Sequence, residues 1–232
     1  MTAVSVIAID GPAASGKSST AQAVARVLGA FHLDSGALYR ALTVVALESE
    51  APRAGELLRR AEDRGLGLER IADGIVPVLD GQAAEPRLRT EAVNTRVSSL
   101  SAVPEVRDWV NGRLREAARR TEAFGGNRPL LVLDGRDIGT VVFPDAPLKI
   151  FLTATPEARA RRRLLQRGLS IDPVRLARES AELAERDRQD RARVIAPLRQ
   201  APDAVVLDTT DMPFQRQVDE IAQLARKRLS LG

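Results

Sequence analysis

Several common features are absent from this sequence of 232 residues. It contains no cysteine, which excludes disulfides and thiolate metal sites. Aromatic residues make up only 3% of the chain, too few for a platform on which single-stranded nucleic acid could stack. No apolar run approaches the roughly 18 residues of a membrane-spanning helix, and the N-terminus lacks the basic flank and cleavage site of a secretory signal. We therefore expect a cytoplasmic protein that binds neither membrane nor nucleic acid.

Lysine is scarce among the basic residues. Only Lys17, Lys149 and Lys227 are lysines, so arginine supplies nearly all of the positive charge on the 35 basic residues. The formal net charge is +4, and acidic residues are interspersed with the arginines along the chain. A nucleic-acid footprint would concentrate basic residues on one face, whereas this distribution fits small polyanionic ligands equally well. No long apolar stretch demands a protein partner, so we expect a monomer.

Apolar runs alternate with helical patterns along the chain. Continuous apolar runs typical of strands buried on both faces of a parallel sheet lie at residues 4–9, 130–133 and 148–152. Shorter strands are predicted at 31–34, 66–71, 75–79 and 204–207. Apolar spacing or an opening proline predicts helices over 19–28, 37–48, 51–64, 104–120, 173–193 and 213–229, and another from residue 156. The pattern predicts one α/β domain over 1–232, with a mostly parallel sheet covered by helices on both faces.

A phosphate-binding loop follows the first predicted strand. It matches the pattern of glycine, four residues, then Gly-Lys-Ser, and consists of Gly11, Pro12, Ala13, Ala14, Ser15, Gly16, Lys17 and Ser18. The glycines let main-chain N–H groups converge on phosphate oxygens, and the helix that begins there adds the positive end of its dipole. Lys17 can reach the β- and γ-phosphates of a nucleotide, and the Ser18 hydroxyl can ligate Mg²⁺. The alternative is a glycine-rich turn that matches the pattern by chance. Because a strand precedes this P-loop and a helix follows it, the sequence favours nucleotide binding.

GTPases, ATP-driven motors and small-molecule kinases share such a loop. A GTPase needs Asn-Lys-x-Asp to read guanine, and no asparagine precedes a lysine in this chain. No Asp-x-x-Gly lies where a γ-phosphate sensor is needed, and motors usually require a longer chain. By elimination, the loop is expected to serve phosphoryl transfer to a small acceptor.

Charged residues at other predicted elements are candidates for contacts with that acceptor. Arg136 and Asp137 directly follow the strand at 130–133, and ligands of open α/β sheets bind at the carboxyl ends of strands. Arg40 lies early in the helix after residues 31–34, where its guanidinium can fork onto a phosphate or carboxylate. Two further sets share helical faces: Arg186, Asp190 and Arg193 at i, i+4 and i+7, and Arg159, Arg162 and Arg163. On spacing alone, these two sets could equally be solvated surface ion pairs.

Two conspicuous residues are assigned structural roles. We expect His32, the single histidine, to be structural because nothing partners it in the sequence. We expect Trp109 to pack against the core from its helix.

Five stretches together resemble bacterial cytidylate kinases, which phosphorylate CMP and dCMP with ATP. In chain order they are IDGPAASGKSS, LDSGALYR, RTEAVNTRVSSLSAVPEVR, LDGRDIGTVVFPDA and ERDRQDRARVIAPL. The second and fourth are much more specific than the phosphate loop, and the set spans nearly the whole chain. The resemblance implies a P-loop kinase core at about 1–50, 128–156 and 200–232, an inserted acceptor-binding lobe at about 51–127, and a helical lid at about 157–199.

The resemblance also implies how the candidate residues divide between ATP and CMP. The phosphate loop through Ser19 would hold the ATP phosphates. Arg159, Arg162 and Arg163 would belong to a mobile lid that closes over these phosphates, with Arg159 and Arg162 among the ATP-binding residues. The acceptor site would comprise Ser35, Arg40, Arg107, Arg136, Asp137, Arg186, Asp190 and Arg193. Of these, Ser35, Asp137, Arg186 and Asp190 would read the cytosine or ribose, and Arg40, Arg136 and Arg193 would hold phosphate oxygens.

Catalysis would then depend on Lys17, Arg136 and Arg193, with Mg²⁺ on Ser18. For Asp134 two roles stay open: it would orient Arg136 or hold a water on Mg²⁺. Two other functions also stay open on the sequence. The chain could be a related kinase of UMP or another nucleotide, or a nucleotide-gated protein whose basic faces grip RNA, although the lack of interleaved aromatic residues argues against RNA.

Overall fold

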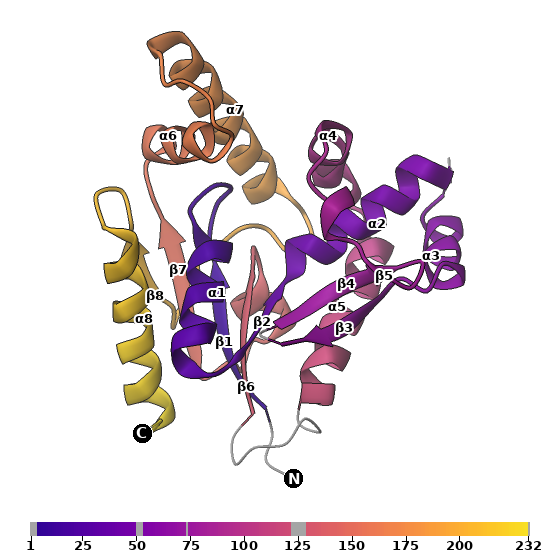
Figure 1. The fold of residues 1–232 in the computed structure, drawn as a ribbon, viewed down its shortest axis with the longest axis horizontal. Helices are drawn as coiled ribbons and strands as arrows, with labels where there is room; N and C mark the ends of the chain where they lie inside the picture. Colours follow the sequence, from indigo (N-terminus) through magenta and orange to yellow (C-terminus); the bar gives the residue numbers. More distant parts are fainter. Residues whose placement is uncertain (1–3, 50–52, 73, 122–128, 232) are drawn as a thin grey trace.

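One continuous sheet organises the fold (Figure 1). The computed structural model describes residues 4–49, 53–72, 74–121 and 129–231. The strands in these ranges are β1 (Ser5–Asp10), β2 (Phe31–Asp34), β3 (Gly67–Ile71), β4 (Gly74–Leu79), β5 (Gln82–Ala83), β6 (Leu130–Gly135), β7 (Leu148–Thr153) and β8 (Val205–Asp208). Their order is β3-β4-β2-β6-β1-β7-β8, with β5 beside β4, and only the β3–β4 and β4–β5 pairs are antiparallel. The predicted mostly parallel α/β sheet is confirmed.

Both faces of the central strands are buried because successive side chains of a strand point to opposite faces. In β1, Val6 and Ala8 belong to the apolar cluster that includes the helices α2 (Ser35–Ser49), α3 (Ala54–Asp63), α4 (Glu91–Leu100) and α5 (Pro104–Thr121). Ile7 and Ile9 belong to a second cluster, formed with α1 (Lys17–Leu28) and α8 (Phe214–Leu229) on the opposite face. The apolar run in β1 therefore has a physical cause: no position in it faces water.

Helices connect the strands and cover both faces of the sheet (Figure 1). They are α1 (Lys17–Leu28), α2 (Ser35–Ser49), α3 (Ala54–Asp63), α4 (Glu91–Leu100), α5 (Pro104–Thr121), α6 (Pro156–Gln166), α7 (Pro173–Ala192) and α8 (Phe214–Leu229). The helices α6 and α7 begin with a side-chain cap: Thr155 accepts a hydrogen bond from Ala158 N–H, and Asp172 accepts one from Arg175 N–H. In the described residues, no helix is both long and apolar enough to cross a membrane.

Four short elements of the described residues were not predicted from the sequence patterns. They are β5, α4, the 3₁₀ turn η1 (Glu85–Arg87) and the π-type turn η3 (Ile138–Val142). The sequence of α4, EAVNTRVSSL, is rich in β-branched residues and serine, which have modest helix propensity. Thr90 nevertheless starts this helix by accepting a hydrogen bond from Val93 N–H.

The β3–β4 hairpin continues the central sheet. β4 pairs in parallel with β2 through His32–Gly74 and Leu33–Ile75. This β-rich part of the expected inserted lobe is therefore joined to the core by strand pairing instead of standing apart from it. Residues 51, 52, 73 and 122–127 of the expected lobe lie outside the described residues. The helices α6 and α7, by contrast, project beyond the end of the sheet (Figure 1).

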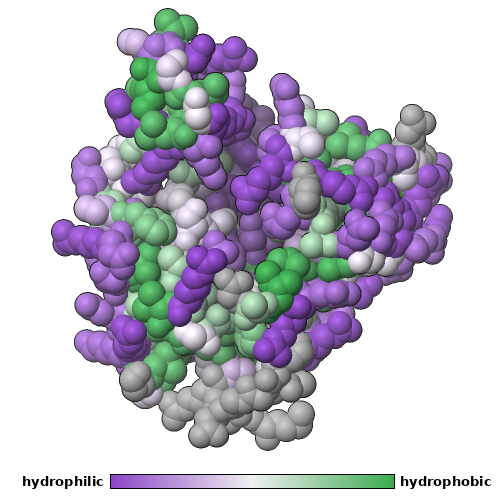
Figure 2. All heavy atoms as spheres, viewed as in Figure 1, coloured by the Kyte–Doolittle hydropathy of each residue, from purple (hydrophilic) through white to green (hydrophobic). Residues whose placement is uncertain are grey.

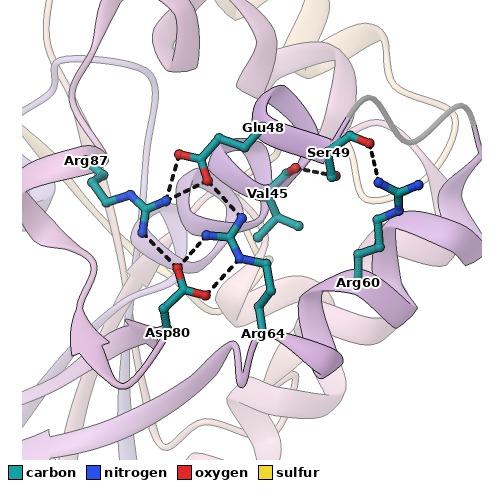
Figure 3. A network of polar contacts seen from close by, with 7 residues as sticks. All are labelled: Val45, Glu48, Ser49, Arg60, Arg64, Asp80 and Arg87. Carbon is teal, nitrogen blue, oxygen red and sulfur yellow. Dashed lines mark hydrogen bonds and ion pairs between the residues drawn. The ribbon is translucent and has the colours of Figure 1, made fainter.

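An exposed network of ion pairs joins the elements around this hairpin (Figure 3). Arg64, at the end of α3, lies 2.8 Å from Glu48 of α2 and donates from Nε to Asp80 Oδ1, after β4, at 2.9 Å. Arg87 of η1 contacts the same acids, 2.6 Å from Glu48 and 3.2 Å from Asp80. Hydrogen bonds from Arg64 lower the pKa of Asp80 to about 2. The network ties α2, which carries Arg40, to the hairpin.

We expect Asp80→Asn to lower the free energy of unfolding by about 1 kcal/mol or less, because exposed ion pairs contribute little and are screened by salt. Asparagine tolerates the φ of 56° that Asp80 adopts, so the substitution isolates the charge. A carboxylate with a lowered pKa stabilises above its unfolded pKa, so the difference should shrink as the pH falls toward about 2. Urea unfolding at low and high salt measures this. A loss of stability that ignores salt would contradict the electrostatic origin.

Candidate active site

The phosphate loop connects β1 to α1 in a conformation that its small residues permit. A Cβ at Gly11 would lie 2.3 Å from the carbonyl oxygen of Leu152, so a larger residue does not fit there. Gly16 and Ala14 have φ values of 87° and 57°, in the left-handed region. Turns of this kind gather main-chain N–H groups into an anion-binding concavity, at the end of α1 where the helix dipole is positive. The predicted nest for phosphate is thus built from main chain.

A cleft of about 1060 Å³ opens where β1, β2 and β6 end. Its walls come from the phosphate loop, the start of α2, the strand β4, and the helices α6 and α7. Figure 2 shows hydrophilic side chains on both sides of the hollow between α6–α7 and the part that contains α2 and α4. This volume is at the upper end of the range for small-molecule sites.

Most of the residues predicted from the sequence line this one cleft. They are Ala13, Ala14, Gly16, Lys17, Ser18, Ser19, Ser35, Arg40, Arg107, Arg136, Asp137, Arg162, Arg163, Arg186, Asp190 and Arg193. Gly11, Pro12, Ser15 and Arg159 do not line it. Gly11, Pro12 and Ser15 shape the loop from behind, whereas Arg159 is 3% exposed and bonded within the protein. The structure therefore places Arg159 away from the cleft, in contact with the phosphate loop from within the protein.

Asp190 holds two of the predicted arginines in place. Its Oδ2 lies 3.1 Å from Arg136 Nε, and its Oδ1 lies 2.5 Å from Arg193 Nη2. Burial opposes ionisation of Asp190, but the charges of Arg136 and Arg193 outweigh it, so the pKa of this carboxyl is lowered. The prediction of one continuous helical face needs correction, because α7 ends at Ala192 and Arg193 has extended backbone. Arg193 still reaches Asp190 across the helix end.

Arg107 and Asp137 form a second, more deeply buried pair. Arg107 Nη2 donates to Asp137 Oδ2 at 2.5 Å, and the two side chains are 2% and 6% exposed. The guanidinium also lies 5.6 Å from the centre of the Tyr39 ring. Burial raises the pKa of Tyr39, so its hydroxyl stays protonated. Asp137 is thus an ionic partner of Arg107 before any ligand arrives.

Two further arginines that line the cleft make fewer or weaker contacts within the protein. Arg40 Nη1 donates to Asn94 Oδ1 at 2.5 Å and to the Leu88 carbonyl at 3.4 Å. Arg186 Nε is buried and has no hydrogen-bond partner among the described residues. Burial, with the charge of Arg136, lowers the pKa of Arg186 to about 10. Both guanidinium groups therefore retain donors for an anionic ligand.

Asp134, near the end of β6, does not line the cleft but contacts two residues that do. It is fully buried and accepts a hydrogen bond from Ser18 Oγ at 2.6 Å, with His32 Nε2 at 2.9 Å. Of its two predicted roles, orientation of Arg136 was wrong, because Arg136 contacts Asp190 instead. His32, expected to be structural, lines the cleft and contacts Asp134. The other structural residue, Trp109, packs against the core, and its Nε1 donates to Glu62.

The residues around Ser18 suit Mg²⁺ in their chemistry. Across the described ranges, no group of three or more His, Cys, Asp or Glu side chains is arranged to hold a metal ion unaided. The Ser18 hydroxyl and the Asp134 carboxylate nevertheless meet at the loop, and Asp34 also lines the cleft. Mg²⁺ prefers oxygen donors and usually takes few from the protein, keeping waters and substrate phosphates as further ligands. The donor set therefore fits.

Burial shifts the titration of two groups next to the loop. Lys17 donates to the Pro12 carbonyl at 3.3 Å, and burial together with the charge of Arg136 lowers its pKa. Burial and the neighbouring Asp134 raise the pKa of Asp34. The lowered pKa of Lys17 is consistent with a site for added negative charge, because phosphate would stabilise the ammonium of Lys17.

Several residues of the site were missed by sequence reasoning. Ser101 accepts hydrogen bonds from Arg193 at its Oγ (3.0 Å) and from Arg107 at its carbonyl (2.9 Å). Asp10 accepts the N–H groups of Ile138 and Gly139, each at 2.8 Å, and so positions the turn after Asp137. Asp10 had a usable signal, since it is an acid at the end of a buried strand. Ser101 had none, since it lies in the turn after α4, and nothing in the sequence marks this turn as part of the site.

The fold and the cleft define the class of protein: a phosphate-loop phosphotransferase with an arginine-rich second subsite. The family model described as cytidylate kinase matches residues 7–227. A cytidylate kinase of Mycobacterium avium (strain 104) is 41% identical over 233 residues, covering 98% of each chain. One of Escherichia coli (strain K12 / DH10B) is 40% identical over 238 residues, covering 100% of both. Among solved structures, shikimate kinase from Bacteroides thetaiotaomicron matches with a TM-score of 0.45 at 15% identity, covering 98% of this chain and 99% of that one.

This chain belongs to the cytidylate kinase family. The resemblance read from its sequence is confirmed at that level. The roles of individual residues toward ATP and CMP stay predictions.

We expect the stability of the wild-type protein, relative to Asp10→Asn, to fall as the pH rises from about 4 to 7. Burial raises the pKa of Asp10 to about 6, above its unfolded value. The folded state then binds a proton that the unfolded state releases, so this contribution is complete below the unfolded pKa and is lost as pH passes the folded pKa. Unfolding of both proteins across this range measures the difference. A difference that grows with pH would contradict the assigned shift.

Proposed function

We propose that this chain transfers the γ-phosphoryl group of ATP to CMP and dCMP. The observation that carries the proposal is a shared cleft. The phosphate loop with Lys17 and the arginines held by Asp190 line the same cavity, although the two sets are more than a hundred residues apart in sequence. A donor phosphate on the loop and an acceptor phosphate on the arginines would then meet inside it.

Phosphoryl transfer between two phosphates requires charge neutralisation and positioning more than acid–base catalysis. The acceptor is already a phosphate oxygen, so no strong base is required, and negative charge spreads over the transferring oxygens. Lys17 would hold the β- and γ-phosphates, and Arg136 and Arg193 would neutralise the transferring group. Their fixed positions supply much of the catalysis, since donors that are already oriented need no reorganisation during transfer.

Mg²⁺ would be held by Ser18, with Asp134 beside it, and would supply further charge neutralisation on the donor phosphates. In the acceptor site, Ser35, Asp137, Arg186 and Asp190 would contact the cytosine and ribose, and Arg40 would hold phosphate oxygens. The helices α6 and α7, with Arg162 and Arg163 at the cleft, would close over the phosphates. Closure would exclude water, which otherwise competes as acceptor and wastes ATP.

The acceptor is tested by ADP release, with CMP, dCMP, UMP, AMP and shikimate offered in turn. The proposal predicts turnover with CMP and dCMP well above that with the other acceptors. Faster turnover with UMP, AMP or shikimate would replace the proposed substrate while keeping the kinase class. ATP binding without turnover of any acceptor would contradict the class itself.

We expect Lys17→Ala to lower kcat/KM for CMP phosphorylation by about a thousandfold, because the variant loses a buried positive charge at the transferring phosphates. Steady-state kinetics with saturating ATP measure the effect. Lys227→Ala is the matched control, since Lys227 lies exposed on α8, outside the cleft. Near-normal kinetics for Lys17→Ala would contradict the assignment of the loop.

We expect Asp190→Asn to lower kcat/KM for CMP by about 10–100-fold, because Arg136 and Arg193 lose their shared anionic anchor. The preference for CMP over UMP should also shrink if Asp190 contacts the nucleoside. Asp203→Asn serves as control, since Asp203 pairs with Lys149 outside the cleft. A normal kcat/KM in Asp190→Asn would exclude this anchoring role.

A further inference from the structure

Ala13 of the phosphate loop is held through both of its main-chain polar groups by side chains from α6 and α7. Arg159 of α6 donates from Nη1 to the Ala13 carbonyl at 2.9 Å. The Ala13 N–H donates to Asp187 Oδ1 of α7 at 3.3 Å. Arg159 Nη2 in turn lies 2.6 Å from Asp187 Oδ2. We call this ring of contacts between Ala13, Arg159 and Asp187 the loop clamp.

The two charged side chains of the loop clamp are closed to solvent and do not line the cleft. Arg159 is 3% exposed and Asp187 is 4% exposed, and neither lines the cleft. Arg159 Nε donates to the Ala154 carbonyl at 3.0 Å, which fixes the guanidinium plane. Apolar packing of Ala13 with Ala160 of α6 and Leu183 of α7 surrounds the polar contacts. These side chains are therefore placed to act on the loop and not on a substrate.

The peptide bond between Ala13 and Ala14 is the group that the clamp orients. A trans peptide is planar, so its N–H points away from its carbonyl oxygen. Arg159 binds the carbonyl of Ala13, and so the N–H of Ala14 points away from Arg159. Ala14 lines the cleft. The clamp thus directs one main-chain donor of the phosphate loop.

Ala14 itself needs such support. Its φ of 57° lies in the left-handed region, which is unfavourable for a residue with a Cβ. Backbone of this kind persists only where its surroundings fix it. Contacts to both polar groups of the preceding residue supply that constraint from α6 and α7.

We infer that Arg159 and Asp187 are positioning residues that set the phosphate loop for ATP and couple it to the helices of the lid. The inference rests on the proposed function only in that ATP occupies the loop. It replaces the direct phosphate contact expected of Arg159 with an action through Ala13 and Ala14. The clamp lies on the donor side, so its loss weakens ATP binding and leaves CMP binding largely intact.

The test compares Arg159→Lys and Asp187→Asn with the wild type by titration calorimetry, using a non-hydrolysable ATP analogue and CMP separately. Lysine keeps the charge but lacks the fork that reaches both Ala13 and Asp187. We expect the Kd of the ATP analogue to rise about tenfold or more and the Kd of CMP to change by less than about twofold. Equal weakening of both ligands, or an unchanged Kd of the ATP analogue, would overturn the inference.

Glu179→Gln is the matched control. Glu179 is buried on α7 and pairs with Arg163 of α6 at 2.7 Å, so it joins the same helices without reaching the phosphate loop. We expect its effect on the Kd of the ATP analogue to stay within about threefold, because the clamp is intact. A rise as large as that in the clamp variants would show a general loosening of α6 against α7, and would overturn the inference.

A measurement on the wild-type protein tests the inference even if the variants do not fold. Hydrogen exchange with and without the ATP analogue should show added protection in α6 near Arg159 and in α7 near Asp187, as well as in the phosphate loop. Protection confined to the loop would contradict the coupling. If the wild type binds the ATP analogue but does not phosphorylate CMP, the proposed function fails while the clamp is still tested.

Discussion

Arginine stays charged in proteins, so every guanidinium that faces the cleft needs an anionic partner or a ligand. Asp190 provides that partner for Arg136 and Arg193, and Asp137 provides it for Arg107. This pairing fixes an array of donors before substrate binds. A phosphate that enters finds the donors already oriented, which is how electrostatic preorganisation lowers a barrier to phosphoryl transfer. The strand ends and helices matter here because they bring these carboxylates to the arginines.

The donor side of the cleft is built on a different basis. The groups proposed to bind its anion are main-chain N–H groups and one lysine, Lys17, and burial lowers the pKa of this lysine. Main chain cannot be charged, so its geometry has to be held by neighbours such as Gly11, packed on Leu152, and by the clamp from α6 and α7. The cleft therefore combines two sites: one whose side chains are oriented by ion pairs, and one whose main chain is held in place by packing. The proposed phosphoryl transfer would require both sites to be correctly placed relative to each other.

The main strands, most helices and the phosphate loop could be predicted from the sequence, because each produces a pattern within its own short segment. The apolar run in β1 and the glycines after it predict a strand and a phosphate nest without knowledge of the fold. Contacts between distant segments had no such signal: nothing local shows that Arg159 turns inward to Ala13, or that Asp134 contacts Ser18 and not Arg136. The same limit applies to η3, whose position depends on Asp10, over a hundred residues away. Side-chain direction at these places is decided by tertiary packing.

The central claim is that two nucleotides meet in one cleft with their phosphates between Lys17 and the arginines anchored by Asp190. A crystal structure of the chain with CMP and a non-hydrolysable ATP analogue tests it most directly. The account predicts the γ-phosphate on the phosphate loop beside Lys17, and the CMP phosphate against Arg136 and Arg193, with an acceptor oxygen in line with the γ-phosphorus. CMP bound outside the cleft, or inside it with its phosphate turned away from the loop, would contradict the account.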